Sequence, residues 1–259
     1  MSSINNKSSN GAEDWLAPQW SAPSSVFAFV TTRTGGVSKA PFGSLNLGLH
    51  VGDEDGDVLA NRECLNQSLP IQKPLQWLSQ VHGNTVVDAQ GDGVTREGDA
   101  AYIDQPGTGA VVMTADCLPV FFASTSGARV AVAHAGWRGL LDGVLENTLE
   151  RFPDAPHEVL VWLGPAIGQC HFEVGAEVRD AFLQCESPND AAARAFVASA
   201  TEGKFFADLY LLARQRLQAK GVRFIHGGGY CTFCDEARFY SYRRENRTGR
   251  FASVIGLLS

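Results

Sequence analysis

The segment 111–139 limits the possible folds of this chain more than any other part of the sequence. It reads VVMTADCLPVFFASTSGARVAVAHAGWRG, and its two apolar runs are typical of buried β-strands. Cys117 lies near the start of one run and His134 at the end of the other. From Gly136 the pattern changes to that of a helix. The segment therefore predicts two buried strands, each with a chemically active side chain at one end, followed by a helix.

Hydrophobic periodicity predicts short strands and helices along the whole chain. The expected strands are 26–31, 75–81, 85–89, 98–104, 109–114, 119–124, 129–135, 158–164, 222–226 and 251–258. The expected helices are 57–69, 137–152, 175–185, 190–199 and 207–220. Because these elements alternate too irregularly for a pure βαβ array, we expect an α/β (α+β) fold with mixed β-sheets between helical layers.

We expect one domain preceded by a tail. Residues 1–20 are polar and rich in Ser and Asn, which predicts disorder, and residues 21–259 form the expected single domain. Segment 186–189 (ESPN) is the strongest internal helix breaker, although no shift in composition marks a domain boundary. The dipeptide Gly83-Asn84 predicts a hairpin-type turn that would place His82 at the rim of a sheet.

Composition and charge exclude several classes of partner. The net charge is −7, so we expect no binding to nucleic acid. No apolar run approaches the ~20 residues that span a bilayer, and the N-terminus has no apolar signal segment. We therefore expect a cytoplasmic protein without membrane contact, as a monomer or weak homodimer. The six cysteines are then reduced thiols.

Three residues form the main candidate site: His82, Cys117 and His134. Zinc accepts thiolate and imidazole ligands, and a catalytic zinc keeps a fourth position open. The same residues suit a second chemistry, in which Cys117 is a nucleophile and a histidine takes its proton. A capping histidine, a core thiol and a strand-end histidine would look the same in the sequence. Asp116 is expected to support the site indirectly, because neighbouring strand residues point to opposite faces.

Arginines supply candidate anion sites. Arg138 follows Gly136 at the expected start of a helix, where unpaired N–H groups attract anions. Arg33 stands at a glycine turn, and Asn46 lies in a glycine-rich loop. An arginine cluster near the C-terminus is suited to phosphate or carboxylate, and it comprises Arg238, Arg243, Arg244, Arg247 and Arg250. No nucleotide-binding glycine motif is present.

The pair Cys231 and Cys234 forms a C-x-x-C motif. Such a motif is found in redox pairs and in zinc ribbons, but a ribbon needs a second copy. The sequence contains no second copy, so two packed thiols are the expected arrangement.

Several motifs together resemble the YfiH-type family, also called the laccase-domain-containing, purine nucleoside phosphorylase or peptidoglycan editing factor family. The motifs are TRTGGVS (32–38), SLNLGLHVGD (44–53), SQVHG (79–83), TADCLPV (114–120), AVAHAGWRG (131–139), LGPAIG (163–168) and FYSYRRENRTGR (239–250). They span residues 25–258 in one order. The chain departs from the family pattern at Gln169-Cys170-His171 and at Cys234.

The resemblance implies one domain of mixed sheets between helices, related to CNF-type cysteine hydrolases. It also implies a zinc ion held by His82, Cys117 and His134. The implied activities are phosphorolysis of adenosine, inosine and methylthioadenosine, deamination of adenosine, polyphenol oxidation, and editing of a UDP-muramyl precursor by an amidase or cysteine hydrolase. Multicopper oxidation ranks low, because a laccase needs many histidine ligands and this chain has six histidines.

The leading hypothesis is a zinc-dependent purine nucleoside phosphorylase with adenosine deaminase side activity. Its partners are a small nucleoside and phosphate, and copper is the less favoured metal. The expected catalytic residues are His82, Cys117, His134 and Arg138, and the expected substrate residues are Arg33, Asn46, Arg243 and Arg244. The alternatives are a muramyl-precursor amidase or cysteine hydrolase and a non-catalytic metal-binding module.

Overall fold

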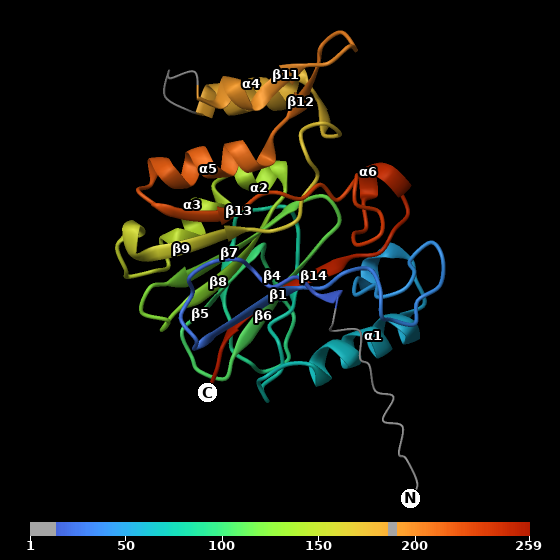
Figure 1. Ribbon diagram of the computed structural model, residues 1–259, viewed down its shortest axis with the longest axis vertical. Coiled ribbons are helices and arrows are strands. Elements are labelled where there is room, and N and C mark those ends of the chain that lie inside the picture. Colours follow the sequence, from blue (N-terminus) through green and yellow to red (C-terminus); the bar gives the residue numbers. More distant parts are fainter. Residues whose placement is uncertain (1–13, 186–190) are drawn as a thin grey trace, which may run out of the picture.

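The computed structural model describes residues 14–185 and 191–259, which are arranged in layers of sheets and helices (Figure 1). The central layer is a six-stranded mixed sheet in the order β13-β9-β7-β8-β5-β3. Its strands are β3 (Val86–Asp88), β5 (Ala100–Ile103), β7 (Leu118–Ser124), β8 (Val130–Ala135), β9 (Val159–Leu163) and β13 (Phe224–Gly227). β9 pairs with β13 and β3 with β5 in parallel, while the other pairs are antiparallel.

A second sheet packs on one face of the first. It is antiparallel, in the order β1-β14-β6, with β1 (Val26–Val30), β6 (Gly109–Thr114) and β14 (Phe251–Leu257). Helix α1 (Asp55–Gln67) covers its outer face, where Leu65 packs with Val111 and Val254. This helix forms the outer layer on that side of the molecule (Figure 1).

Helices cover the other face of the six-stranded sheet. They are α2 (Trp137–Leu141), α3 (Val144–Leu149) and α5 (Leu209–Ala219). Helix α4 (Ala176–Cys185) and a small sheet lie beyond α5 in Figure 1; that sheet contains β10 (Glu173–Gly175), β11 (Phe196–Ala198) and β12 (Lys204–Ala207). The remaining elements are β2 (Leu78–Ser79), β4 (Arg96–Glu97), α6 (Tyr242–Glu245) and short 3-10 turns at Leu49–Val51, Pro156–Glu158 and Ala192–Ala195.

Strand β7 shows why the apolar runs are continuous. Leu118, Val120 and Phe122 pack in the core under the helices, whereas Phe121 and Ala123 pack between the two sheets. Because both faces of the strand are covered, every position of the strand is buried, and no polar alternation remains in the sequence.

The expected fold class is confirmed, since mixed sheets lie between helical layers. Two expected helices were wrong. The helix predicted over 137–152 is broken into α2 and α3 at Gly143, whose φ of 91° places it in the left-handed region. The helix predicted over 190–199 is a 3-10 turn followed by β11, which pairs with β12. Cross-strand pairing there overrides local helix propensity.

The expected hairpin around Gly83-Asn84 was also wrong. β2 pairs with β4 and β3 pairs with β5, both in parallel, so the strands that flank His82 do not pair with each other. The strand predicted over 75–81 is reduced to β2 and a single bridge at Gln76. A buried carboxylate, described below, holds this segment in place of a turn.

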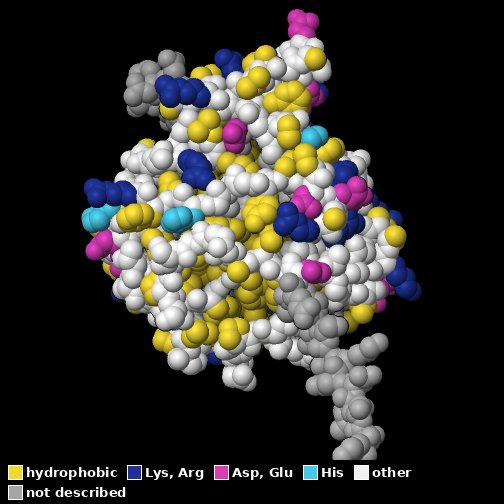
Figure 2. Space-filling view, viewed as in Figure 1, with side chains coloured by type: hydrophobic (Ala, Val, Ile, Leu, Met, Phe, Trp, Pro, Cys, Tyr) yellow, Lys and Arg dark blue, Asp and Glu magenta, His cyan; other side chains and the backbone are white. Residues whose placement is uncertain are grey.

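The N-terminal segment and the charge pattern complete the description. Of the tail predicted over 1–20, residues 1–13 lie outside the described residues. The predicted helix breaker at 186–189 also lies outside them. Within the rest of the predicted tail, Leu16 forms a β-bridge with Val30, and Trp15 stacks on Phe29. On the face in Figure 2, basic and acidic side chains are interspersed. No helix of the described residues combines the length and apolar composition needed to cross a membrane.

Phe121 tests the packing between the two sheets. It is 1% exposed and stacks on Trp162 with 5.6 Å between ring centroids. We expect Phe121→Ala to lower the free energy of unfolding by about 3–5 kcal/mol, because it leaves a cavity. Phe224→Ala, at a 48% exposed position, is the control and should cost less than about 1 kcal/mol. Equal losses in urea unfolding would contradict this view of the core.

Candidate functional site

Strand register brings three distant residues together. In the β7–β8 pair Leu118 lies opposite Ala135, which places Cys117, just before β7, beside the end of β8 and His134. In the β5–β8 pair Ala100 lies opposite Ala133, so Asp99 also lies next to His134. The site is therefore built at one end of the central strands of the six-stranded sheet.

The Asp99 carboxylate organises the site. It is fully buried and accepts N–H groups from Val81 (3.2 Å), His82 (2.9 Å) and Gly83 (2.7 Å). It also accepts the Nδ1 hydrogen of His134 at 2.8 Å. These bonds hold His82 with a φ of 62°, a conformation that non-glycine residues rarely adopt. They also leave Nε2 of His134 facing the site.

The ligand atoms of His82, Cys117 and His134 all lie within 4.8 Å of one another. The Cys117 Sγ atom is 3.9 Å from Nε2 of His82. The imidazole rings of His82 and His134 lie edge to face, with 4.8 Å between their centroids. One thiolate and two imidazoles suit zinc or copper. The carboxylate behind His134 is the usual partner of a metal-binding histidine. The residues present therefore fit a metal ion.

Two glycines of the HAGWRG motif make room for this arrangement. A Cβ atom at Gly136 would lie 3.0 Å from His82 Cδ2 and 3.1 Å from the Cys117 sulfur. A Cβ atom at Gly139 would lie 2.5 Å from the Gly83 carbonyl oxygen. The motif therefore allows helix α2 to pack directly behind the three candidate ligands.

Asp116, for which the sequence predicted an indirect role, lines the cavity beside Cys117. Its φ is 93°, so the backbone bends at this residue. Its carboxylate accepts hydrogen bonds from the Thr232 hydroxyl and from the Arg243 backbone N–H, both at 2.7 Å. Asp116 thereby connects the Cys117 loop to the C-x-x-C loop and to helix α6.

Electrostatics favour a thiolate beside an imidazolium when no metal is bound. Burial opposes ionisation of Cys117, but the charge and hydrogen bond of His134, with a smaller contribution from His82, lower its pKa to about 6. Burial also opposes protonation of His134, yet the Cys117 thiolate and the Asp99 carboxylate raise its pKa to about 9. The pKa of Asp99 is lowered despite its burial, mainly by the hydrogen bond from His134.

The candidate ligands open onto a cavity of about 650 Å³. Apolar and aromatic side chains line part of it, namely Leu78, Met113, Ala115, Ile167, Phe172 and Tyr242. His50, Arg243 and Arg250 also line it and give one side a basic character. Burial, followed by the nearby Arg250 charge, lowers the pKa of His50.

The predicted arginines have different surroundings. Arg243 lines the cavity, and its Nη1 atom donates to the carbonyl oxygens of His171 and Glu173. Arg33 instead donates to carbonyl oxygens and to Glu245. Arg244 donates to the carbonyl oxygens of three residues in the same region, Thr232, Phe233 and Phe239.

Arg138 and Asn46 also lie outside the cavity lining. Arg138 is exposed on α2, with its guanidinium over the Trp137 ring. Asn46 is buried, and its side-chain oxygen accepts N–H groups from Gly48 and Arg250. Asn46 thus positions the arginine that does line the cavity.

Sequence reasoning missed Asp99 and did not single out Arg250. Asp99 stands in GDAAYID, a strand-like run in which nothing identifies one acid as buried. Arg250 is one of five clustered arginines, and only the fold separates it from Arg238 and Arg247.

This chain is similar to known proteins over nearly its whole length. A family model described as multi-copper polyphenol oxidoreductase laccase matches residues 27–258. A protein of Pseudomonas aeruginosa named purine nucleoside phosphorylase is 56% identical, over 94% of this chain and 98% of its own length. The Escherichia coli protein named purine nucleoside phosphorylase YfiH is 48% identical, with the same coverage. A Neisseria meningitidis structure of family DUF152 superposes with a TM-score of 0.89 at 45% identity, covering 95% of this chain and 99% of that one.

Asp99→Asn tests the organising role of the carboxylate. An amide has one oxygen in place of two and would set its NH₂ group against a backbone or ring N–H. We expect metal affinity to fall by roughly 10–100-fold, measured by competition with a chelator. Asp104→Asn, at an exposed position just after the far end of β5, is the matched control and should bind metal as the parent does. Equal affinity in both variants would contradict the assignment.

The pKa of Cys117 predicts how this thiol reacts in metal-free protein. Only the thiolate is alkylated, so the rate of Cys117 modification by iodoacetamide should rise with pH through a midpoint near 6. In His134→Ala the midpoint should move up toward the ordinary thiol value of about 8.5. Peptide-resolved mass spectrometry gives both curves, and an unchanged midpoint in the variant would refute the pairing.

Proposed function

Because the chain belongs to the YfiH-type family, we propose that it is a zinc-dependent purine nucleoside phosphorylase that splits adenosine, inosine and methylthioadenosine with phosphate. One observation carries the proposal. The cavity is lined by the three candidate metal ligands and also by Arg243 and Arg250. A site for an anion therefore adjoins a site for an activating cation, as a phosphorolytic reaction requires.

The size and lining of the cavity support a nucleoside substrate. Small-molecule sites usually enclose about 300–1,000 Å³ and combine apolar walls with a few polar groups. The cavity volume of about 650 Å³ falls in this range. Phe172 and Tyr242 offer aromatic surface for a purine ring, and Met113 and Ile167 offer apolar surface.

The basic side of the cavity suits phosphate. Among the residues that the structure describes, the guanidinium of Arg250 donates only from Nη1, to the carbonyl oxygens of Thr248 and Gly249, so Nε and Nη2 are available to an anion. Burial lowers the pKa of Arg250, which reflects a cation held away from water. The pKa of His50 is lowered, which favours its neutral form, and a neutral imidazole can accept a hydrogen bond from hydrogen phosphate.

Phosphorolysis forms a bond between a phosphate oxygen and ribose C1′ and breaks the bond from C1′ to the purine. The electron pair leaves with the base, so charge builds up on the purine as it departs. A zinc ion bound by His82, Cys117 and His134 would supply a Lewis acid with an open fourth position. Arg243 and Arg250 would orient the phosphate and exclude water from its position.

Deamination of adenosine is the proposed side activity, and it takes place at a different carbon atom. Water adds to C6 of the purine and ammonia leaves, and a zinc ion held by His82, Cys117 and His134 would supply the chemistry that activates such a water. Polyphenol oxidation, which the family description suggests, is less well supported. The histidines found in candidate metal clusters of the described residues are His82, His134 and His171. Three histidines in two clusters are too few for the several coppers of a laccase.

A cysteine hydrolase acting on a muramyl-peptide precursor is the second candidate. The observation that favours it is the thiolate–imidazolium pair of Cys117 and His134, which is typical of activated cysteine nucleophiles. The two candidates differ in their response to chelation. A phosphorylase loses activity when zinc is removed and regains it on addition, whereas a thiol hydrolase keeps its activity without metal.

Product analysis with inosine tests the proposed function. Purified protein should release hypoxanthine and ribose 1-phosphate only when phosphate is present, and Cys117→Ala should release neither. Adenosine without phosphate should yield inosine slowly. Absence of product from inosine under both conditions, with zinc bound, would refute the phosphorylase proposal.

Arg250→Gln tests the phosphate site. Loss of a charged hydrogen-bond donor should raise the KM for phosphate by about tenfold or more and leave the KM for inosine less affected. Arg247→Gln is the matched control, since its guanidinium donates to the Gly52 carbonyl oxygen and does not line the cavity. Initial rates at varied phosphate distinguish the two, and equal effects would place the anion elsewhere.

A further inference from the structure

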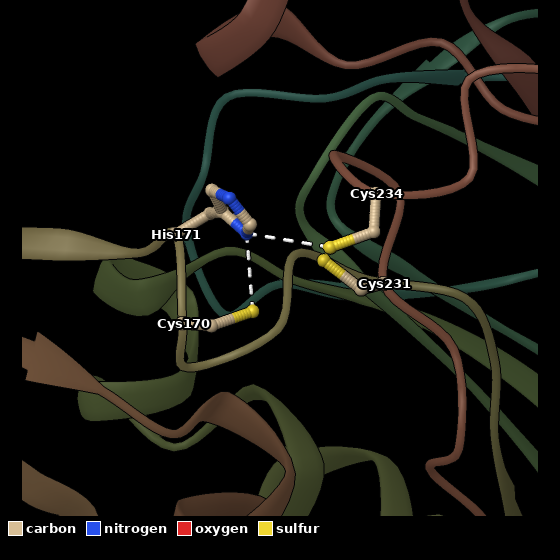
Figure 3. A group of neighbouring side chains, drawn as sticks. All are labelled: Cys170, His171, Cys231 and Cys234. Atoms are coloured by element: carbon tan, nitrogen blue, oxygen red, sulfur yellow. Dashed lines mark hydrogen bonds between the residues drawn. The ribbon is translucent and has the colours of Figure 1, made fainter.

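A second group of metal-type side chains lies outside the site described above. Cys170, His171, Cys231 and Cys234 each offer one ligand atom, and these four atoms lie within 4.8 Å of one another. Figure 3 shows the four side chains pointing toward one another from two different loops. The Nδ1 atom of His171 is 3.0 Å from the Cys170 sulfur and 3.4 Å from the Cys234 sulfur.

Two tight turns present these groups. In the first, the N–H groups of His171 and Phe172 donate to the Gly168 carbonyl oxygen, which directs Cys170 and His171 toward the second loop. In the second, the N–H of Asp235 donates to the Cys231 carbonyl oxygen, so Cys231 and Cys234 lie on one side of a single turn. The Gly168 N–H donates to the Cys231 sulfur at 3.2 Å and joins the two turns.

The donor set matches a closed tetrahedral zinc site. Three thiolates and one imidazole form a common structural zinc site, with Zn–S bonds of about 2.3 Å and Zn–N bonds of about 2.0–2.1 Å. Tetrahedral ligands at those lengths lie roughly 3.5–3.8 Å apart. The observed distances of 3.0 and 3.4 Å from His171 Nδ1, and the upper limit of 4.8 Å for all pairs, bracket this range. The His171 ring stacks on Phe233 with 3.9 Å between centroids, which fixes its orientation.

We propose that Cys170, His171, Cys231 and Cys234 bind a second zinc ion, separate from the cation held by His82, Cys117 and His134. Four protein ligands leave no open position, so this ion is structural. It would join two loops that are about 60 residues apart in the sequence. The ligand atoms come from the C-x-x-C motif and from the Cys-His pair, which the proposed reaction does not use.

The proposed ion would hold one wall of the catalytic cavity. His171 precedes Phe172, which lines that cavity, and the His171 carbonyl oxygen accepts a hydrogen bond from Arg243. Thr232, between the two cysteines of the second loop, donates to Asp116. Both loops therefore contact residues adjacent to the first site, and fixing them would keep Phe172 and Arg243 in position.

Metal content tests the proposal directly and needs no activity assay. Protein equilibrated with Zn²⁺ and passed through a desalting column should contain two zinc ions per chain. Cys117→Ala and Cys234→Ser should each contain one, and the double variant none. Cys185→Ser is the matched control, because Cys185 is exposed and belongs to neither cluster, and it should retain two.

Spectroscopy identifies which ligands remain. X-ray absorption at the zinc edge of Cys117→Ala should show three sulfur ligands at about 2.3 Å and one nitrogen. Cys170→Ser is a second test of the same site, in case Cys234→Ser does not fold. It should also contain one zinc ion fewer than the parent. Loss of the second zinc should lower the thermal midpoint and raise the KM for inosine, while the first zinc remains bound.

Three results would overturn the proposal. The first is a zinc content in Cys234→Ser and Cys170→Ser equal to that of the parent. The second is a zinc-free Cys117→Ala protein that is folded. The third is a disulfide among Cys170, Cys231 and Cys234 in protein purified without reductant that persists after mild reduction and zinc addition. None of these results bears on phosphorolysis, which the inosine assay tests separately.

Discussion

One buried carboxylate determines the geometry of the candidate site. Asp99 accepts three consecutive backbone N–H groups from residues 81–83 and the Nδ1 hydrogen of His134. A buried charge of this kind is stable only when every acceptor position is used, so the loop and the imidazole are fixed together. The left-handed backbone of His82 and the free Nε2 of His134 both follow from this one interaction.

The sequence predicted the strands and the candidate ligands better than it predicted the connections. Continuous apolar runs identify β7 and β8 because both faces of these strands are buried, and the unusual side chains beside them are recognisable by type. Asp99 was not predictable, since its role depends on the register between β5 and β8. The break between α2 and α3 occurs at Gly143, which adopts a left-handed conformation. The hydrophobic pattern does not predict that conformation.

The roles of the individual arginines were also not predictable from the sequence. Charge counting indicated a basic cluster, but it does not show which guanidinium groups donate to the chain from two or more nitrogen atoms and which donate from Nη1 alone. Arg33 and Arg244 are engaged with the chain itself, whereas Arg250 and Arg243 line the cavity. Long-range contacts determine which arginines line the cavity; one of them is the hydrogen bond from the Arg250 backbone N–H to the Asn46 side chain. Proximity of Cys170 to Cys231 is likewise a property of the folded chain alone.

The order of the three-stranded sheet has a consequence for how the chain is made. β14 lies between β1 and β6, yet it follows both in the sequence by more than a hundred residues. During synthesis β1 and β6 therefore leave the ribosome with unpaired edges, and they remain so until β14 emerges. Arg243 and Arg250 arrive in the same late segment. A nascent chain thus holds the three candidate metal ligands before it holds Arg243 and Arg250, and one edge of each of two apolar strands stays unpaired in the interval.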